Sequence, residues 1–467
     1  MAQDSGTVRT TGDAVGTSVM DRTATGPVPQ VLRSCAEAEA YVASVCFKHG
    51  PPRLAGVELE WVLHRVDAPA APVDLPALIA ALGPHIPTAL DPSSPALPLP
   101  AGSTVTVEPG GQVELASPPM PGLGALVPAA QSDADELHRL LASHGMRPQP
   151  RAADPIRPPR RVLELPRYRA MEQSFDRIGP YGRTGMCSTA AVQVCLDAGE
   201  GPAIATRWNV LHALGPVLVA AFANSPVLHG RPTGWKSSRM ATWLSLDPAR
   251  TAPPASVNGD PAAAWAARVV QSPLLCVRRE GTWSVPERVT FADWVRGALP
   301  TAPTTADLDY HVSTLFPPVR PRGHLEVRYI DGQSGREWAL PTAVLVALLS
   351  DPVVIDRVLE ACEPARDRWI SAARHGLADR VLARAAATVF PLACAALPAA
   401  GAPPELVAAL ADVIERRVLR GRCPADDPPP LDDPAGGAAP GQPVACTDRA
   451  FPFDPTDRPG TPEGERS

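Results

Sequence analysis

Within the segment AGVELEWVL, residues 55–63, apolar and acidic side chains alternate strictly from Val57 to Trp61. Successive side chains of a β-strand point to opposite faces, so Glu58 and Glu60 would share one face while Val57 and Leu59 occupy the other. A Glu-x-Glu pair on a strand is most often an ordinary solvent-exposed face. It can also be a pair of oxygen ligands for a hard cation. The segment therefore predicts a strand and leaves two roles open for its carboxylates.

Three further segments repeat this pattern of a polar face and an apolar face. They are TVTVEPGGQVEL (104–115) with Glu108 and Glu114, STAAVQVCLD (188–197) with Gln193, and GHLEVRYID (323–331) with Glu326 and Arg328. The Pro-Gly-Gly break in the first predicts a hairpin or a bulge, so its two carboxylates have no assignable common face. Together the four strands predict an α+β fold. Its curved antiparallel sheet would have helices packed on the outer, apolar face and an open cleft on the other.

Convergence of these acidic groups would be electrostatically costly. Two unit charges about 5 Å apart repel by roughly 3 kcal/mol at an effective dielectric constant near 20, and a divalent cation would relieve that repulsion. Carboxylate and amide oxygens favour Mg²⁺ or Mn²⁺ over Zn²⁺. Mg²⁺ held by several carboxylates is typical of phosphate chemistry on a nucleotide. The chain has no GxxxxGK[ST] or GxGxxG motif, so metals and arginines would have to bind the phosphates.

Composition sets the domain plan. The chain has 467 residues, 45% of them hydrophobic, which is enough to bury a large core. Residues 1–30 are polar, do not resemble a secretory signal and are predicted to form a disordered leader. Residues 421–467 are rich in Pro and Asp and are predicted to form a disordered tail. A single folded domain is therefore expected over residues 31–420.

The sequence also argues against several classes of protein. No apolar run reaches the roughly 18 residues that span a bilayer, so no membrane association is expected. A net charge of -6, with no basic run interleaved with aromatics, argues against nucleic-acid binding. Nine cysteines without a CxxC pair predict free thiols and a reducing cytoplasm. The oligomeric state is not predicted.

Five longer motifs carry a family resemblance. They are GVELEW, VEPGGQVELAS, TGMCSTAAVQVCLDAG, FANSPVLHGRPTGWKSSRMATWLSLDPART and DYHVSTLFPPVRPRGHLEVRYID. Over roughly residues 31–400 the chain resembles the glutamate-cysteine ligases of the plant and bacterial type, in the glutamine synthetase-like superfamily. Within them it is most similar to the actinobacterial ligases of ergothioneine biosynthesis. The resemblance implies that ATP phosphorylates the γ-carboxylate of glutamate and that the amine of cysteine then attacks to give γ-glutamylcysteine, ADP and phosphate.

The resemblance also implies roles for individual residues, with two or more Mg²⁺ (or Mn²⁺) ions as cofactor and ATP as co-substrate. Glu60, Glu108 and Glu114 would hold the ion nearer glutamate, and Glu58, Gln193 and Glu326 the ion nearer the ATP phosphates. Arg328 would neutralise the transferring phosphoryl group and, with Arg250, bind ATP. Arg239, Trp243, Ser188 and Thr189 would bind the amino-acid substrate.

Ordinary structural roles remain open for several of these residues. Arg239 could be a surface or salt-bridged arginine, Trp243 a core residue, and Arg250 a cap of its own turn. Hydroxyls such as those of Ser188 and Thr189 often bond to local backbone.

The chain departs from the family pattern at two places. Cys195 stands where an Asn is common in the family, and Gly185-Met186 replaces a Met pair. Neither Cys187 nor Cys195 has a His at a recognisable spacing, and free Cys is most often a small buried hydrophobe. His311 is expected to be a structural or pocket residue and not a base.

Apolar spacing of three and four predicts helices over 205–223, 341–361, 364–387 and 404–419, which would back the sheet or cover one end of the cleft. Three rival functions stay open. The acceptor could be a different amine, the chain could be a non-catalytic nucleotide-binding relative, or it could be a Mg²⁺-dependent phosphohydrolase.

Overall fold

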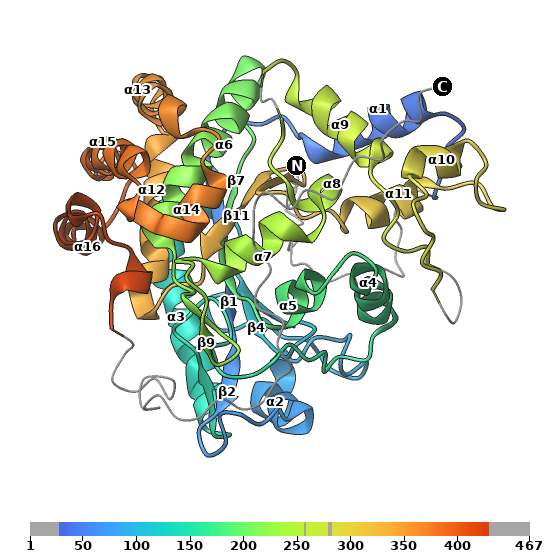
Figure 1. Cartoon of the computed structure of the whole chain (residues 1–467), viewed down its shortest axis with the longest axis horizontal. Helices are drawn as coiled ribbons and strands as arrows, with labels where there is room; N and C mark the ends of the chain where they lie inside the picture. The colour runs from blue at the N-terminus through green and yellow to red at the C-terminus, as the bar shows by residue number, and fades with distance from the viewer. Residues whose placement is uncertain (1–27, 256–257, 279–282, 429–467) are drawn as a thin grey trace, which may run out of the picture.

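A computed structural model describes residues 28–255, 258–278 and 283–428, and its centre is a seven-stranded sheet (Figure 1). The strands are β1 (Leu54–Trp61), β3 (Thr104–Val107), β4 (Val113–Ala116), β5 (Met120–Pro121), β7 (Ala191–Leu196), β10 (Val319–Pro321) and β11 (Leu325–Asp331). Their order is β10-β11-β7-β1-β4-β3, and β5 pairs with the start of β1. Every pair in this sheet is antiparallel. The predicted α+β class and antiparallel sheet are confirmed.

One face of the sheet is the apolar face that the alternation predicted. Val57, Val194 and Val327, on three neighbouring strands, are at most 1% exposed. Helices α3 (Leu123–Ala142), α6 (Pro202–Phe222) and α12 (Ala339–Leu348) contact these strands. The Tyr329 hydroxyl on β11 donates to the Leu211 carbonyl of α6 at 2.9 Å. The core therefore lies between the sheet and these helices.

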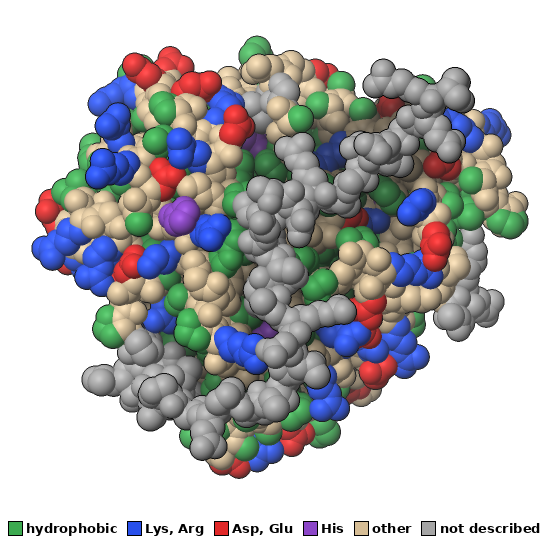
Figure 2. Space-filling model, viewed as in Figure 1, with side chains coloured by type: hydrophobic (Ala, Val, Ile, Leu, Met, Phe, Trp, Pro, Cys, Tyr) green, Lys and Arg blue, Asp and Glu red, His purple; other side chains and the backbone are tan. Residues whose placement is uncertain are grey.

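Outer helices cover α6 from its far side, which explains why almost all of α6 is buried. They are α13 (Pro352–Cys362), α14 (Trp369–His375) and α15 (Arg380–Ala396), and α16 (Pro404–Arg416) packs in turn on α12 and α15. A Cβ at Gly215 of α6 would lie 2.0 Å from the Trp369 ring, so only glycine lets α14 approach so closely. Figure 1 shows α12 to α16 gathered on one side of the sheet. Over this side, cationic and anionic side chains are interspersed (Figure 2).

The opposite, polar face of the sheet is bordered by a second set of helices. Near it lie α4 (Pro166–Asp176), α5 (Tyr181–Cys187), α7 (Ser238–Leu246) and α8 (Pro248–Thr251); beyond them lie α1 (Cys35–Cys46), α9 (Pro261–Gln271), α10 (Phe291–Val295) and α11 (Thr305–Val312). Two small two-stranded sheets lie outside the main sheet: β2 (Leu63–Arg65) pairs with β6 (Met146–Pro148), and β8 (Val227–Leu228) pairs with β9 (Arg231–Pro232). A short helix, α2, spans Leu75–Leu82. A second apolar cluster, containing Phe175, Met186 and Tyr310, holds this layer together.

Two predicted helices are broken in the structure. The predicted helix 341–361 divides into α12 and α13, because Asp351 caps the N-terminus of α13 and Pro352 follows at its first position. The predicted helix 364–387 divides into α14 and α15, because Gly376 ends α14 at φ +57° and Asp379 caps α15. No single helix among the described residues is long and apolar enough to cross a bilayer, although the bent pair 335–348 and 352–365 has that length and composition.

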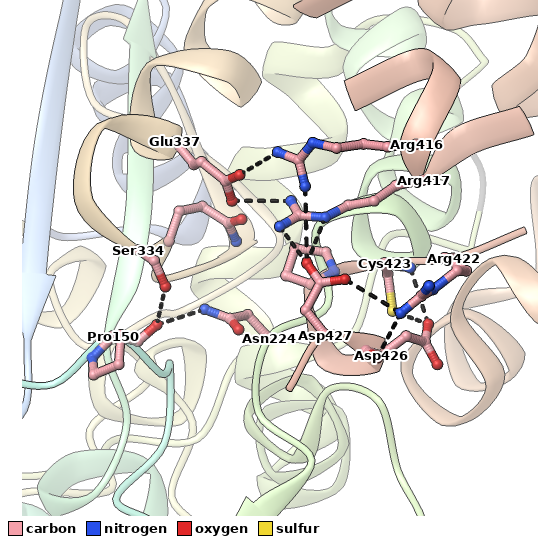
Figure 3. Close-up of polar contacts among 12 residues, drawn as sticks. Pro150, Asn224, Ser334, Glu337, Arg416, Arg417, Arg422, Cys423, Asp426 and Asp427 are labelled. Atoms are coloured by element: carbon pink, nitrogen blue, oxygen red, sulfur yellow. Dashed lines mark hydrogen bonds and ion pairs between the residues drawn. The ribbon is translucent and has the colours of Figure 1, made fainter. Parts of the chain in front are cut away.

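The predicted C-terminal tail begins too early. Residues 421–428, which we call the C-terminal clasp, pack on the folded domain, and Cys423 is 0% exposed. Asp427 pairs with Arg417 at 2.5 Å, and Asp426 caps the backbone of Cys423 (Figure 3). The domain therefore extends at least to residue 428. Residues 1–27 of the predicted leader and 429–467 of the predicted tail lie outside the described residues.

Candidate active site

A cavity of about 850 Å³ lies over the polar face of the sheet. The strands and their turns contribute Glu60, Thr106, Glu108, Gln112, Glu114, Gln193, Arg320, Arg322 and Arg328; α5, α7 and the loop after α5 contribute Gly185, Met186, Thr189, Arg239 and Trp243; other segments contribute Arg167, Tyr168, Arg278, Trp283 and Phe316, among others. The lining thus contains several carboxylates together with many arginine and aromatic side chains.

Strand register places the predicted acidic residues on one face. Glu60 lies opposite Glu114 across the β1–β4 pair, and Glu58 lies opposite Gln193 across β1–β7. Glu326 lies opposite Cys195 across β7–β11. Directly opposed residues of antiparallel strands point to the same face. Four separate segments therefore bring their polar groups together, as the alternation predicted.

The Pro-Gly-Gly break forms the hairpin between β3 and β4. The Gly111 N–H donates to the Glu108 carbonyl at 2.7 Å, which closes a four-residue turn. A Cβ at Gly110 would lie 2.2 Å from the Cys187 carbonyl oxygen, so glycine is required for this approach. The Gln112 amide donates to the Thr189 carbonyl at 2.9 Å. The turn is therefore braced against the segment that leads into β7, and this brace fixes the position of Glu108.

Four of the glutamates, Glu58, Glu60, Glu108 and Glu114, lie in surroundings that disfavour their ionised form, and we call them the acidic wall. Burial raises the pKa of all four, Glu58, Glu60, Glu108 and Glu114, and the last two reach about 7. Repulsion adds to the effect, from Glu114 on Glu58, from Glu60 on Glu108 and from Glu108 on Glu114. Nearby arginines lower the pKa of Glu60 and Glu108 but do not reverse the shift.

Glu326 lies on the same face with the opposite electrostatic outcome. Arg320 donates to both of its oxygens, at 2.7 and 2.8 Å, and Arg328 contacts Oε1 as well. Burial alone would raise the pKa of Glu326, but Arg320 and Arg328 hold it below its usual value. Arg328 also donates to the Gln193 Oε1 atom, and the Gln193 amide donates to Glu60 at 2.6 Å. Arg328 therefore links Glu326 to the acidic wall.

The acidic wall fits a divalent cation better than the predicted second set of ligands does. The Oε2 atom of Glu58 is buried without a hydrogen-bond partner, and charge repulsion within the wall would be relieved by a cation. For Glu326, however, arginines occupy both oxygens. Within residues 28–255, 258–278 and 283–428, no three His, Cys, Asp or Glu side chains are already grouped as ligands around one point. A cation would therefore have to draw these oxygens together.

Three of the four predicted amino-acid-binding residues border the site. Arg239 on α7 lines the cavity, is 5% exposed and donates to the Arg328 carbonyl at 2.7 Å. Trp243, one turn later, packs on the Phe316 ring with centroids 5.5 Å apart. Its indole N–H donates to the Thr189 hydroxyl at 3.4 Å. Arg239, Trp243 and Thr189 therefore face one cavity, together with Arg328.

Four predicted site residues lie outside the cavity lining: Glu58 and Glu326, which are buried on their strands, and Ser188 and Arg250. Ser188 is 1% exposed, and its hydroxyl bonds to the His229 ring at 3.1 Å. Arg250 is buried, pairs with Asp247 at 3.0 Å and donates to the Thr314 hydroxyl at 3.0 Å. The side chains of Ser188 and Arg250 thus contact other parts of the protein. The predicted roles of Ser188 in substrate binding and of Arg250 in ATP binding stay predictions.

The thiols and His311 have structural surroundings. Burial raises the pKa of the Cys187 thiol to about 12 and that of Cys195 well above its usual value. His311 is 3% exposed and bonds to the Val269 carbonyl at 2.9 Å. These surroundings agree with the interpretation that none of the three is a nucleophile or a base.

Sequence reasoning missed most of the cationic side of the cavity. Arg320 and Arg322 come from the Pro-rich segment PPVRPRG before β11, where their position directly before an acidic strand was an available signal. Arg167 and Arg278 come from distant segments and flank the Tyr310 ring at 5.2 and 4.7 Å. Nothing in their local sequence distinguishes these two from surface arginines. The cavity thus combines carboxylates that would hold a cation with arginines that would hold an anion.

The sequence matches a known protein family and several known proteins. Residues 54–430 match the family described as Glutamate-cysteine ligase family 2 (GCS2). The glutamate-cysteine ligase EgtA of Mycobacterium tuberculosis is 42% identical over 407 residues, with 85% of this chain and 90% of that protein covered. EgtA of Mycolicibacterium smegmatis is 40% identical over 406 residues, with 86% and 92% covered.

More distant proteins match as well. The chloroplastic glutamate-cysteine ligase of Medicago truncatula is 29% identical over 62% of this chain and 57% of that protein. A crystal structure of glutamate-cysteine ligase from Francisella tularensis in complex with AMP covers 81% of this chain and 84% of its own, with a TM-score of 0.47 and 15% identity. From the family match and the EgtA identities, this chain belongs to glutamate-cysteine ligase family 2.

Proposed function

We propose that this chain is an ATP-dependent glutamate-cysteine ligase that joins the γ-carboxylate of L-glutamate to the amine of L-cysteine through γ-glutamyl phosphate. One observation carries the proposal: a single cavity is lined by Glu60, Glu108 and Glu114 of the acidic wall together with Arg239, Arg320, Arg322 and Arg328. Formation of an acyl phosphate brings two anions together, a carboxylate and a triphosphate. The site must therefore offset charge and fix orientation, and it needs no covalent protein nucleophile.

The residues of the cavity divide this work. Arg239 would bind the α-carboxylate of glutamate through its planar guanidinium, which matches carboxylate geometry. Trp243 would border the substrate and exclude water from it. Arg328 would offset charge on the transferring phosphoryl group, with Arg322 placed to bind further phosphate oxygens. Glu60, Glu108 and Glu114 would hold Mg²⁺, which when bound neutralises phosphate charge and orients the γ-phosphate.

A second Mg²⁺ at Glu58, Gln193 and Glu326 requires a rearrangement. Arg328 would have to leave Glu326 and Gln193, whose oxygens it contacts here. Arg320, which donates to both oxygens of Glu326, would have to leave as well. Binding of ATP would favour both departures, because phosphate oxygens compete for the same guanidinium groups. We therefore propose that the second ion binds with ATP, and that the first binds the acidic wall.

The similarity to the EgtA ligases supports a biosynthetic pathway, and the cysteines support a cellular compartment. We propose that the γ-glutamylcysteine is made for ergothioneine biosynthesis, in line with the resemblance to the EgtA ligases. All eight cysteines among the described residues are free thiols, which is typical of a reducing cytoplasm.

Product identification tests the proposal. The full chain is incubated with glutamate, cysteine, ATP and Mg²⁺, and a γ-linked dipeptide is sought by mass spectrometry together with ADP and phosphate. Parallel reactions replace cysteine by alanine or other amines, or omit amino acids. The Arg328→Gln protein, purified identically, controls for contaminating enzymes. Equal rates with cysteine and alanine would remove the cysteine assignment. Phosphate release that needs no amino acid would favour a phosphohydrolase instead.

A further inference from the structure

Asp331, the last residue of β11, is a buried carboxylate beside the site. It is 2% exposed and is not among the residues that line the cavity. Its Oδ2 atom accepts from the Asn224 backbone N–H at 2.9 Å and from the Ser225 hydroxyl at 2.8 Å. Its Oδ1 atom accepts from the Ser237 hydroxyl at 2.8 Å. Three hydrogen bonds therefore join the end of β11 to two other segments.

Both of those segments control the first turn of α7. Ser237 is the N-cap of this helix, and its hydroxyl oxygen accepts from the Met240 N–H at 3.0 Å. The Ser225 hydroxyl oxygen accepts from the Arg239 N–H at 3.1 Å, and the Ser225 carbonyl accepts from the Ser238 N–H at 3.0 Å. The backbone that carries Arg239 is thus held through two hydroxyls, and Asp331 accepts from both.

Asp331 also acts on the Arg239 side chain directly. The Asp331 Oδ1 atom lies 3.6 Å from one terminal guanidinium nitrogen of Arg239. The other terminal nitrogen donates to the Arg328 carbonyl on the same strand β11. The Nε atom of Arg239 is buried without a hydrogen-bond partner. One edge of the guanidinium is therefore fixed against β11, and the residue lines the cavity.

From these contacts we infer that Asp331 is a positioning residue that sets the orientation of Arg239 for glutamate binding. It acts through Ser225, Ser237 and the ion pair, and it does not touch substrate. The inference rests on the proposed function, in which Arg239 binds the α-carboxylate of glutamate. A neutral side chain at residue 331 would remove the ion pair and leave the guanidinium with the Arg328 carbonyl as its contact on β11, and a bidentate contact with substrate tolerates little misorientation.

The test is the steady-state kinetics of Asp331→Asn, a change that keeps the size of the side chain and removes its charge. We expect the KM for glutamate to rise at least 10-fold, while kcat stays within about threefold and the KM for ATP is unchanged. In an Arg239→Gln background, Asp331→Asn should change the glutamate KM less than threefold, because its route to substrate is already lost. An unchanged glutamate KM in the single variant, or an equal effect in both backgrounds, would overturn the inference.

A matched control separates positioning from stability. Asp379, the N-cap of α15, is likewise a carboxylate that accepts from a hydroxyl and pairs with an arginine, here Ser371 and Arg368 at 2.6 and 2.9 Å, and it does not line the cavity. Asp379→Asn should lower the melting temperature without altering the glutamate KM. A rise in KM for this control would show that loss of stability alone produces the effect.

Two further comparisons keep the test decisive. If Asp331→Asn does not fold, Ser225→Ala replaces it, because this change removes the hydroxyl that contacts both Asp331 and the Arg239 N–H. We expect the glutamate KM of Ser225→Ala to rise about threefold or more. No rise would overturn the inference. If the wild-type chain forms no γ-linked dipeptide, the proposed function has failed. If the wild type is active and Asp331→Asn behaves like wild type, only the positioning role has failed.

Discussion

Glu114 and Glu326 are the same residue type on the same face of the same sheet, and both are almost completely buried. Their environments differ: Glu326 is bound by Arg320 and Arg328, whereas Glu114 faces the other members of the acidic wall. The pKa of Glu326 is lowered, and that of Glu114 is raised to about 7. The difference indicates which carboxylates are already neutralised by the protein and which still attract a cation.

Arg328 belongs to both environments, and its replacement should give the largest effect. Arg328→Gln removes the cation that contacts Glu326 and that lowers the pKa of Glu60 and Glu108. We expect kcat for dipeptide formation to fall about 1,000-fold, the scale of arginines that stabilise phosphoryl transfer. Arg336→Gln, an arginine 80% exposed in its side chain beyond β11, is the control. A loss of less than 10-fold would show that Arg328 has no role in the transfer.

Glu326→Gln tests the neutralised side of the comparison. The change leaves Arg320, 3% exposed, without its buried counter-charge, and breaking one partner of a buried ion pair typically costs about 3–5 kcal/mol. Chemical denaturation of the metal-free protein measures this loss. Glu415→Gln, on the exposed side of α16, should leave the unfolding free energy unchanged. Wild-type stability for Glu326→Gln would mean that the Arg320 pair is not what neutralises this carboxylate.

Glu114→Gln should behave in the opposite way. Removing one member of the acidic wall relieves repulsion on Glu58, so the metal-free protein at pH 8 should become more stable. Activity should fall about 100-fold with a higher Mg²⁺ requirement, because ligand-site changes weaken metal binding by 10- to 100-fold or more. Parallel Mg²⁺ titrations of activity and thermal melts in EDTA measure both effects. Lower metal-free stability than wild type would contradict the assignment of Glu114 to the wall.

Alternation of side chains predicted both faces of the sheet, because a two-residue period fixes which residues share a face. It did not show that Glu326 pairs with Arg320, because β10 is only three residues long and carries no alternation of its own. The two residues face each other across the short β10–β11 hairpin. Local signals for the helix breaks were present in Asp351-Pro352 and in Gly376 with Asp379. The continuous apolar spacing on both sides of them outweighed those signals in the prediction.

Two assignments carried over from the family motif concern side chains that do not line the cavity. Ser188 and Arg250 fall in segments that match the family, but a matching segment does not show which way a side chain points. The structure directs Arg250 toward Asp247 and Thr314. The clasp was missed because composition described residues 421–467 as one unit, although Cys423 is an apolar anchor within that unit. Composition averages over such single buried residues.

The pH dependence of Mg²⁺ stabilisation sharpens the comparison further. The pKa of Glu108 and Glu114 rises from the usual 4.5 to about 7 in the metal-free fold. The folded chain therefore holds these protons more tightly than the unfolded chain, and the resulting stability is complete below pH 4.5 and lost as pH rises through about 7. Mg²⁺ binds the deprotonated groups, so its stabilising effect should increase by about 1.4 kcal/mol per group between pH 6 and pH 8. Thermal melts with Mg²⁺ or EDTA at both pH values measure it; equal shifts at both would show that these carboxylates do not titrate in this range.

The smallest expected effect is that of Asp427→Asn on the unfolding free energy, because this carboxylate is partly exposed to solvent. Asp427 of the clasp is neutralised by Arg417, as Glu326 is by Arg320, but its side chain is 29% exposed. Water screens such a pair, so Asp427→Asn should cost about 1 kcal/mol or less in unfolding free energy and leave the glutamate KM unchanged. The Asp412 side chain on α16, which pairs with Arg416, is 63% exposed. Asp412→Asn should therefore have no measurable effect on the unfolding free energy. The Glu326–Arg320 and Asp427–Arg417 pairs are both carboxylate–arginine pairs and differ in burial. If Asp427→Asn lowered the unfolding free energy as much as Glu326→Gln does, burial would not explain the difference between them. The clasp would then be an integral part of the core rather than a segment fastened to its surface.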